Sequence, residues 1–185
     1  MSLSVQKRAE NVGTFRFIHV FLMETLARWV PNTPEMEVKV IFGRHIWDLA
    51  QQADALGHRT YELRAPLQFS LSPKDEYVKF LEDFRSTVTT QQRIHGFYDV
   101  ILPRLASRYQ AYLDSTDRLL DEPTARIIDR ILGDFSRMRD ESKELKNELP
   151  KLRLDDKEWP AQLANREAAE ASIVAHRPVA AAAQA

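Results

Sequence analysis

Apolar residues recur every three to four positions along most of the chain, which is the spacing of one face of an α-helix. Four stretches repeat this pattern long enough to predict core helices, at about 14–30, 34–61, 73–112 and 122–149. Proline follows the first and the last stretch, and an N-capping Ser or Asp precedes the third and the fourth. The long segments do not alternate as strands do, so the sequence predicts an all-α fold.

Four helices with short connections predict one four-helix-bundle domain over residues 1–150. The third helix contains Gly96 and Pro103, so we expect a kink or a break there. Residues 151–185 end in an Ala-rich stretch without aromatic residues. We expect this segment to be an extended or disordered, mobile tail.

The charge and composition narrow the classes of partner. A formal net charge of -1 and a pI near 6.5 predict neither nucleic-acid nor membrane-surface binding, both of which favour concentrated basic residues. The chain has no Cys, which excludes disulfides and Cys-ligated metals. It has neither the apolar run of a signal peptide nor a stretch of about 20 apolar residues, so we expect a cytoplasmic protein.

Pairs of His and Asp on two predicted helices are candidate metal ligands. His45 and Asp48 project from the same face of the second helix, and His95 and Asp99 repeat the arrangement on the third. A His and a carboxylate one turn apart can share a metal ion, and the two pairs could face each other across the bundle. Glu24 lies among apolar residues of the first helix, where an unpaired carboxylate would be costly to bury.

Each candidate also has a purely structural alternative. Glu24 could lie at the margin of the bundle, paired with an arginine. His45 could be held by Asp48 or by a carbonyl oxygen. Glu122, the sixth candidate, begins the fourth helix, and acids are favoured at helix N-termini whatever the function.

Two runs of sequence resemble a known family. The run RHIWDLAQQADALGHRTYELR resembles the second bundle helix of ferritin-like proteins, and LLDEPTARIIDRILGDF is similar to the start of their last helix. The resemblance covers about residues 14–135 and implies a four-helix bundle of the di-iron carboxylate type. Such a site takes a Glu from each of two helices and a Glu-x-x-His motif from each of the other two, and this chain contains no Glu-x-x-His.

The resemblance therefore implies a degenerate metal site. Matched residue by residue, Glu24 takes the place of the first-helix acid and Asp48 that of the second-helix acid. Gln51 and Gln52 fall on the neighbouring acid and His positions, and amides are poor substitutes for carboxylate or imidazole ligands of iron. In the fourth helix the family's acid and His positions fall on Phe135 and Met138, which we expect to lie in the core.

Three functions are compatible with these features. We expect a ferritin-like binding or accessory protein without a complete di-iron centre and without a cofactor, which could form a homodimer and could hold a small organic ligand inside the bundle. The alternative is a non-haem iron or manganese oxidase or oxygenase with atypical ligands from the six candidates. A helical module that docks through the mixed-charge stretch 137–158 is the third. Whether the protein is an enzyme stays open.

Overall fold

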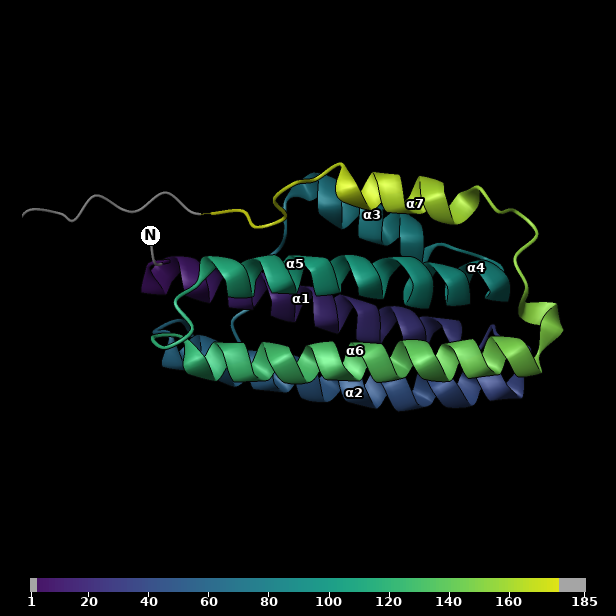
Figure 1. The fold of residues 1–185 in the computed structure, drawn as a ribbon, viewed down its shortest axis with the longest axis horizontal. Coiled ribbons are helices and arrows are strands. Elements are labelled where there is room, and N and C mark those ends of the chain that lie inside the picture. Colours follow the sequence, from purple (N-terminus) through teal and green to yellow (C-terminus); the bar gives the residue numbers. More distant parts are fainter. Residues whose placement is uncertain (1–2, 177–185) are drawn as a thin grey trace, which may run out of the picture.

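The computed structural model describes residues 3–176 of the chain, and within that range it contains helices and no strand (Figure 1). The long helices are α1 (Val5–Trp29), α2 (Met36–Glu62) and α6 (Glu122–Glu148). A fourth rod is formed without interruption by α4 (Thr90–Ile94), the π-helix η1 (His95–Ile101) and α5 (Leu102–Ser115). These rods lie side by side, which confirms the predicted all-α fold for the described residues.

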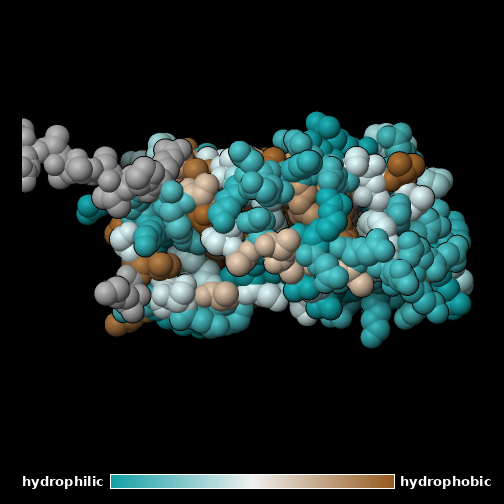
Figure 2. Space-filling model, turned by 90° about the horizontal axis from the view of Figure 1, so that it is seen from above, coloured by the Kyte–Doolittle hydropathy of each residue, from teal (hydrophilic) through white to brown (hydrophobic). Residues whose placement is uncertain are grey.

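A second, thinner layer covers α5 (Figure 1). It consists of α3 (Asp75–Arg85) and α7 (Trp159–Ala168), and the short 3₁₀-helix η2 (Pro150–Leu152) leads from α6 towards α7. Seen from above this layer, hydrophilic side chains dominate the face and apolar ones form small separate patches (Figure 2). None of the described helices combines the length and the apolarity that a membrane span requires.

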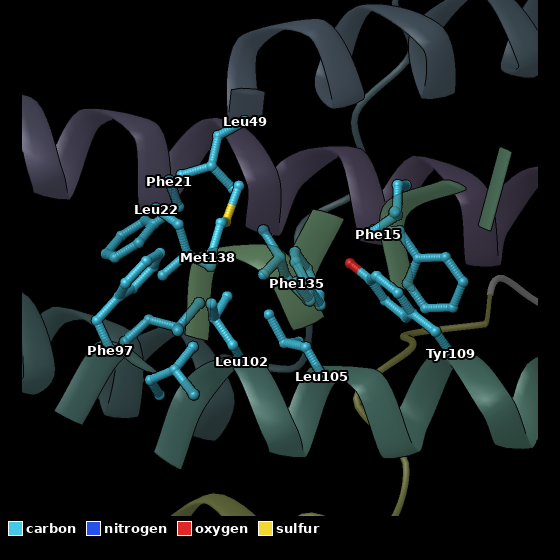
Figure 3. Packing of buried hydrophobic residues seen from close by; sticks show 14 of the residues in the cluster. Phe15, Phe21, Leu22, Leu49, Phe97, Leu102, Leu105, Tyr109, Phe135 and Met138 are labelled. Atoms are coloured by element: carbon cyan, nitrogen blue, oxygen red, sulfur yellow. The ribbon is translucent and has the colours of Figure 1, made fainter. Parts of the chain in front are cut away.

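The core lies where the four rods meet (Figure 3). Leu22 of α1, Leu49 of α2 and Leu105 of α5 pack around Phe135 and Met138 of α6, and all five side chains are at most 1% exposed. These two α6 residues stand where the ferritin-like pattern has an acid and a His. Their burial among leucines gives that part of the bundle an apolar interior.

The ends of α2 and α6 match the predicted boundaries closely, whereas α1 is longer than predicted. It begins at Val5 because the Ser4 hydroxyl accepts a hydrogen bond from the backbone N–H of Lys7, which caps the helix. Buried Ala9 and Val12 extend its apolar face towards the N-terminus.

The third predicted helix breaks at residues 86–89, not at Gly96 or Pro103. Thr89 caps the following helix by accepting a hydrogen bond from the backbone N–H of Gln92. Gly96 lies instead in the π-helix η1, whose wider hydrogen-bonding pattern inserts an extra residue into the turn. Pro103 follows in the first turn of α5. The break lets α3 fold back as part of the second layer.

Gly96 provides the space in which α3 and α7 approach η1. A Cβ at this position would lie 2.5 Å from the ring of Phe84, 3.0 Å from that of Trp159 and 3.3 Å from Leu163. We expect Gly96→Ala to lower the free energy of unfolding by about 1–3 kcal/mol, because packed rings must shift. Urea unfolding measures the change. Gly133→Ala on α6 is the matched control, since its Cβ would meet no atom within 4 Å; equal stability of the two variants would contradict the prediction.

The segment after α6 differs from the predicted mobile tail over residues 151–176. Leu152 and Leu163 are buried, and Glu167 of α7 is 2% exposed. The Glu167 carboxylate accepts hydrogen bonds from Arg108 at 2.6 Å and from Tyr77 at 3.2 Å. A charged segment with scattered apolar residues does not predict this docking, because its few contacts are recognisable only once α3 and α5 are in place. The last part of the predicted tail, residues 177–185, lies outside the described residues.

Candidate functional site

Two of the six candidate ligands lie on the surface of the molecule. Glu24 on α1 is exposed, which matches the alternative at the bundle margin and not a buried carboxylate. Glu122 begins α6, is about half exposed and forms an ion pair with Arg126 one turn later. Its position is the one that a helix N-terminus favours for an acid. Neither side chain lies where it could join a site in the interior.

His95 and Asp99 form a pair, but it serves to join helices. His95 Nδ1 lies 2.8 Å from Asp99 Oδ2, and His95 Nε2 lies 3.1 Å from the carbonyl oxygen of Leu152 in η2. Lys146 of α6 donates to Asp99 at 2.7 Å. Burial by itself would raise the pKa of Asp99. The hydrogen bonds from His95 and Lys146 lower the pKa and outweigh burial, so it lies below its ordinary value. The pair does not contact His45 or Asp48, contrary to the expectation that the two pairs face each other.

His45 is fully buried between α2, η1 and α6, and both ring nitrogens have partners. Nδ1 lies 2.7 Å from the hydroxyl oxygen of Tyr98, and Nε2 lies 3.2 Å from Glu141 Oε2. Burial lowers the pKa of His45, and the nearby carboxylates of Glu141 and Asp48 only partly offset this. The sequence predicts Asp48 or a carbonyl oxygen as the partner of His45. The observed partner Glu141 lies within a charged run, a pattern typical of a solvated helix face, so the sequence gives no signal for it.

Asp48 instead belongs to a group of three carboxylates around one guanidinium, which we call the Arg137 cluster: Arg137, Asp48, Asp134 and Glu141. Arg137 donates to Asp48 at 2.9 Å, to Asp134 at 3.3 Å and to Glu141 at 3.0 Å. The three α6 residues are spaced three and four apart and so share one helix face, which α2 meets. Hydrogen bonds from Arg137 to Asp48 are the main reason why the pKa of Arg137 is raised.

The two adjacent glutamines of α2 point to different environments. Gln51 is exposed, whereas Gln52 is 4% exposed and donates to Asp134 at 2.9 Å. Gln52 also lies beside His19 of α1, a residue that the sequence analysis did not single out. Burial lowers the pKa of His19 to about 3, with Gln52 opposing the shift, and His19 Nε2 lies 2.9 Å from the hydroxyl oxygen of Tyr109. Polar contacts thus continue from the Arg137 cluster into the core.

A groove of about 750 Å³ runs between α2 and α6 next to the Arg137 cluster. Asp48, Gln52 and Asp134 line one part of it, and Ile131 contributes an apolar surface. The indole of Trp47 lines the groove from α2 and is 65% exposed. The groove therefore joins the polar cluster to a large aromatic side chain that water can reach.

The donor set at the Arg137 cluster does not suit iron or manganese. A divalent cation would need the carboxylate oxygens that Arg137 already binds, and the nitrogens of His45 are held by Tyr98 and Glu141. Across residues 3–176, no group of three or more His, Cys, Asp or Glu side chains is placed to hold a metal ion. The geometry provides an internal ion network beside a surface groove.

No protein-family model, no curated protein and no solved structure matches this chain. The ferritin-like resemblance therefore stays a prediction from two runs of sequence.

Proposed function

We propose that this chain is a binding or accessory protein, built on a ferritin-like helical bundle that lacks a di-iron centre. One observation carries the proposal: the guanidinium of Arg137 binds the three carboxylates of the α2–α6 seam. Arg137, a permanent cation, thereby binds the carboxylates that a metal ion would need as ligands.

The physical argument concerns charge. Arginine stays protonated at every physiological pH, and its carboxylate partners raise its pKa further. A divalent metal would have to approach that positive charge and strip the same oxygens from it. Because the Arg137 cluster is only partly exposed, solvent would screen this repulsion incompletely.

The exposed side of α2 supports binding as the remaining role. It carries large apolar side chains that contact little within the chain, which we call the α2 stripe: Met36, Val40, Trp47 and Tyr61. Each is more than half exposed. Aromatic residues and Met are enriched in interaction surfaces, where burying them against a partner gains hydrophobic free energy. We place the binding function on the α2 stripe and the adjoining groove.

Metal content tests the proposal against the oxidase alternative. We expect protein expressed in iron- and manganese-supplemented medium to hold well below one equivalent of either metal by inductively coupled plasma mass spectrometry. Arg137→Met should lower the free energy of unfolding by about 1–2 kcal/mol, a modest loss because Arg137 is 40% exposed. Metal gained by this variant but not by the wild type would support the idea that the guanidinium fills the cation's place.

Arg126→Met is the matched control, because its ion pair with Glu122 is exposed on both sides and should contribute at most about 0.5 kcal/mol. About two equivalents of iron or manganese in the wild-type protein would overturn the proposal and favour the oxidase or oxygenase.

A further inference from the structure

We propose that a pocket at the end of α1 binds the phosphate group of a small, soluble phosphate monoester. The pocket has a volume of about 390 Å³ and lies between the last turn of α1, the loop that follows α3, and α4. We call it the arginine pocket after three of the residues that line it, Arg28, Arg85 and Arg93. It shares no residue with the groove or with the α2 stripe, so this inference goes beyond the proposed function.

The arginine pocket gathers positive charge without acids of its own. Among the described residues that line it, none is Asp or Glu. Within residues 3–176, the one carboxylate that pairs with any of the three arginines is that of Glu82, which lies 3.9 Å from Arg85 Nη2 and is 57% exposed. Water screens such a distant and exposed partner, so it offsets little of the charge. Three cations without a lining acid favour an anion that carries more than one negative charge.

Arg93 is the buried cation of the pocket, and only 6% of its surface is exposed. Its Nε donates to the carbonyl oxygen of Thr87 at 3.1 Å, and its Nη1 lies 3.3 Å from both the carbonyl oxygen of Asn32 and the hydroxyl of Thr33. These acceptors are neutral, and Nη2 donates to no described residue. Burial lowers the pKa of Arg93, and no described carboxylate opposes the shift. A buried guanidinium without a counter-charge is costly, and an anion in the pocket would reduce that cost.

The other two arginines complete the pocket. Arg28 is exposed and forms no hydrogen bond or ion pair with a described residue, so its guanidinium is free to meet a ligand. Cζ of Arg85 lies 4.4 Å from the centre of the Phe21 ring, and Cζ of Arg93 lies 5.6 Å from that of Trp29. The indole N–H of Trp29 donates to the carbonyl oxygen of Arg85 at 3.0 Å. Aromatic rings thus hold two of the guanidiniums before a ligand arrives, which lowers the entropy cost of binding.

The chemistry and the size of the pocket favour a phosphate monoester. A guanidinium can donate to two oxygens at once, which suits phosphate and carboxylate groups. A phosphate monoester carries close to two negative charges at neutral pH, so it matches three cations better than a carboxylate does. The volume of about 390 Å³ is at the lower end for sites that hold small organic molecules. Val88, which is 78% exposed, lines the pocket and offers an apolar contact to the organic part.

Isothermal titration calorimetry with phenyl phosphate tests the pocket. We expect a dissociation constant on the order of 0.1–1 mM at low salt and weaker binding at high salt, because ions screen the charges. Inorganic phosphate should bind more weakly, because it lacks the part that contacts Val88. Phenol, which lacks the phosphate group, should not bind measurably.

Arg28→Met is the decisive variant, because Arg28 contributes no hydrogen bond or ion pair to the described fold. It should raise the dissociation constant for phenyl phosphate about tenfold. Arg93→Gln removes the buried charge and should raise it at least as much, with circular dichroism to check that helix content is preserved. Arg139→Met on α6 is the matched control. Arg139 is also exposed and without an ion pair among the described residues, but it does not line the pocket, so binding should be unchanged.

Three outcomes would overturn the proposal. The first is no binding of phenyl phosphate up to about 10 mM, or equal weakening by Arg28→Met and Arg139→Met. The second is equal affinity for phenyl phosphate and inorganic phosphate, which contradicts a monoester. A lipid headgroup carries the same phosphate chemistry, so vesicles of phosphatidylcholine with phosphatidate form a separate arm. Cosedimentation that Arg28→Met abolishes, without binding of phenyl phosphate, is the third outcome and would assign the pocket to a lipid.

Discussion

Changing Asp121 to Ala is expected to lower the free energy of unfolding by about 3 kcal/mol. The Asp121 carboxylate is fully buried and accepts four hydrogen bonds. Tyr112 and Thr124 donate at 2.6 Å, and Thr116 and Arg59 donate at 3.0 Å. Removing the carboxylate leaves these donors without their acceptor, and the guanidinium of Arg59, which is 9% exposed, loses its buried counter-charge.

The size of this loss follows from what remains around Arg59. Glu62 still accepts a hydrogen bond from Arg59 at 2.8 Å, but its carboxylate is 57% exposed and is screened by water. The loss should therefore lie at the lower end of the range for broken buried ion pairs. In thermal unfolding it corresponds to a fall in Tm of roughly 6–12 °C for a chain of this size.

Asp129→Ala is the matched control for this prediction. Asp129 also pairs with an arginine, Arg118, but at 3.5 Å and with both side chains more than half exposed. Its loss should change the unfolding free energy by no more than about 0.5 kcal/mol. Similar losses in the Asp121 and Asp129 variants would show that the buried network does not stabilise the fold as its geometry indicates.

Acidification from pH 6.5 to pH 4.5 is expected to cost about 2–3 kcal/mol of stability through His19 alone. His19 is completely buried, and burial lowers its pKa from 6.5 to about 3. Below pH 6.5 the unfolded chain binds a proton at this residue, whereas the folded chain does not until about pH 3. Protons therefore favour the unfolded state, and stability falls as the pH falls through this window.

Urea unfolding at several pH values measures the effect in the wild-type protein and in His19→Gln. The glutamine can still bond to Tyr109 but does not titrate, so the variant should lose less stability on acidification. His58→Gln is the control, because His58 lies exposed at the surface of α2. Parallel pH profiles for the wild type and His19→Gln would contradict the prediction. His45, whose pKa is also lowered by burial, should add to the wild-type slope in the same direction.

Features of the fold that depend on residues close together in the chain could be predicted from the sequence. The extents of α2 and α6 could be predicted from apolar periodicity and from prolines near their ends. The same periodicity placed Phe135 and Met138 in the core. It also identified His45 and Asp48 as polar residues on one helix face, because a helix of known phase sets which side chains project together.

The partners of these side chains become visible in the three-dimensional arrangement of the helices. His45 bonds to Tyr98 and Glu141, which lie 53 and 96 residues away along the chain. Helical phase alone cannot show that α2 meets the face of α6 that carries Arg137, nor that Gln52 turns inwards. Those outcomes depend on the rotation and the register of α2 against α6, which are set by packing across the whole bundle.

The docking of α7 was decided in the same way. Glu167 becomes a buried acceptor only because Arg108 and Tyr77, from two other helices, converge on it. The pattern of one segment predicts only which face of that segment is apolar. The free energy of an ion pair or a buried hydrogen bond depends on groups that the fold brings together from different segments.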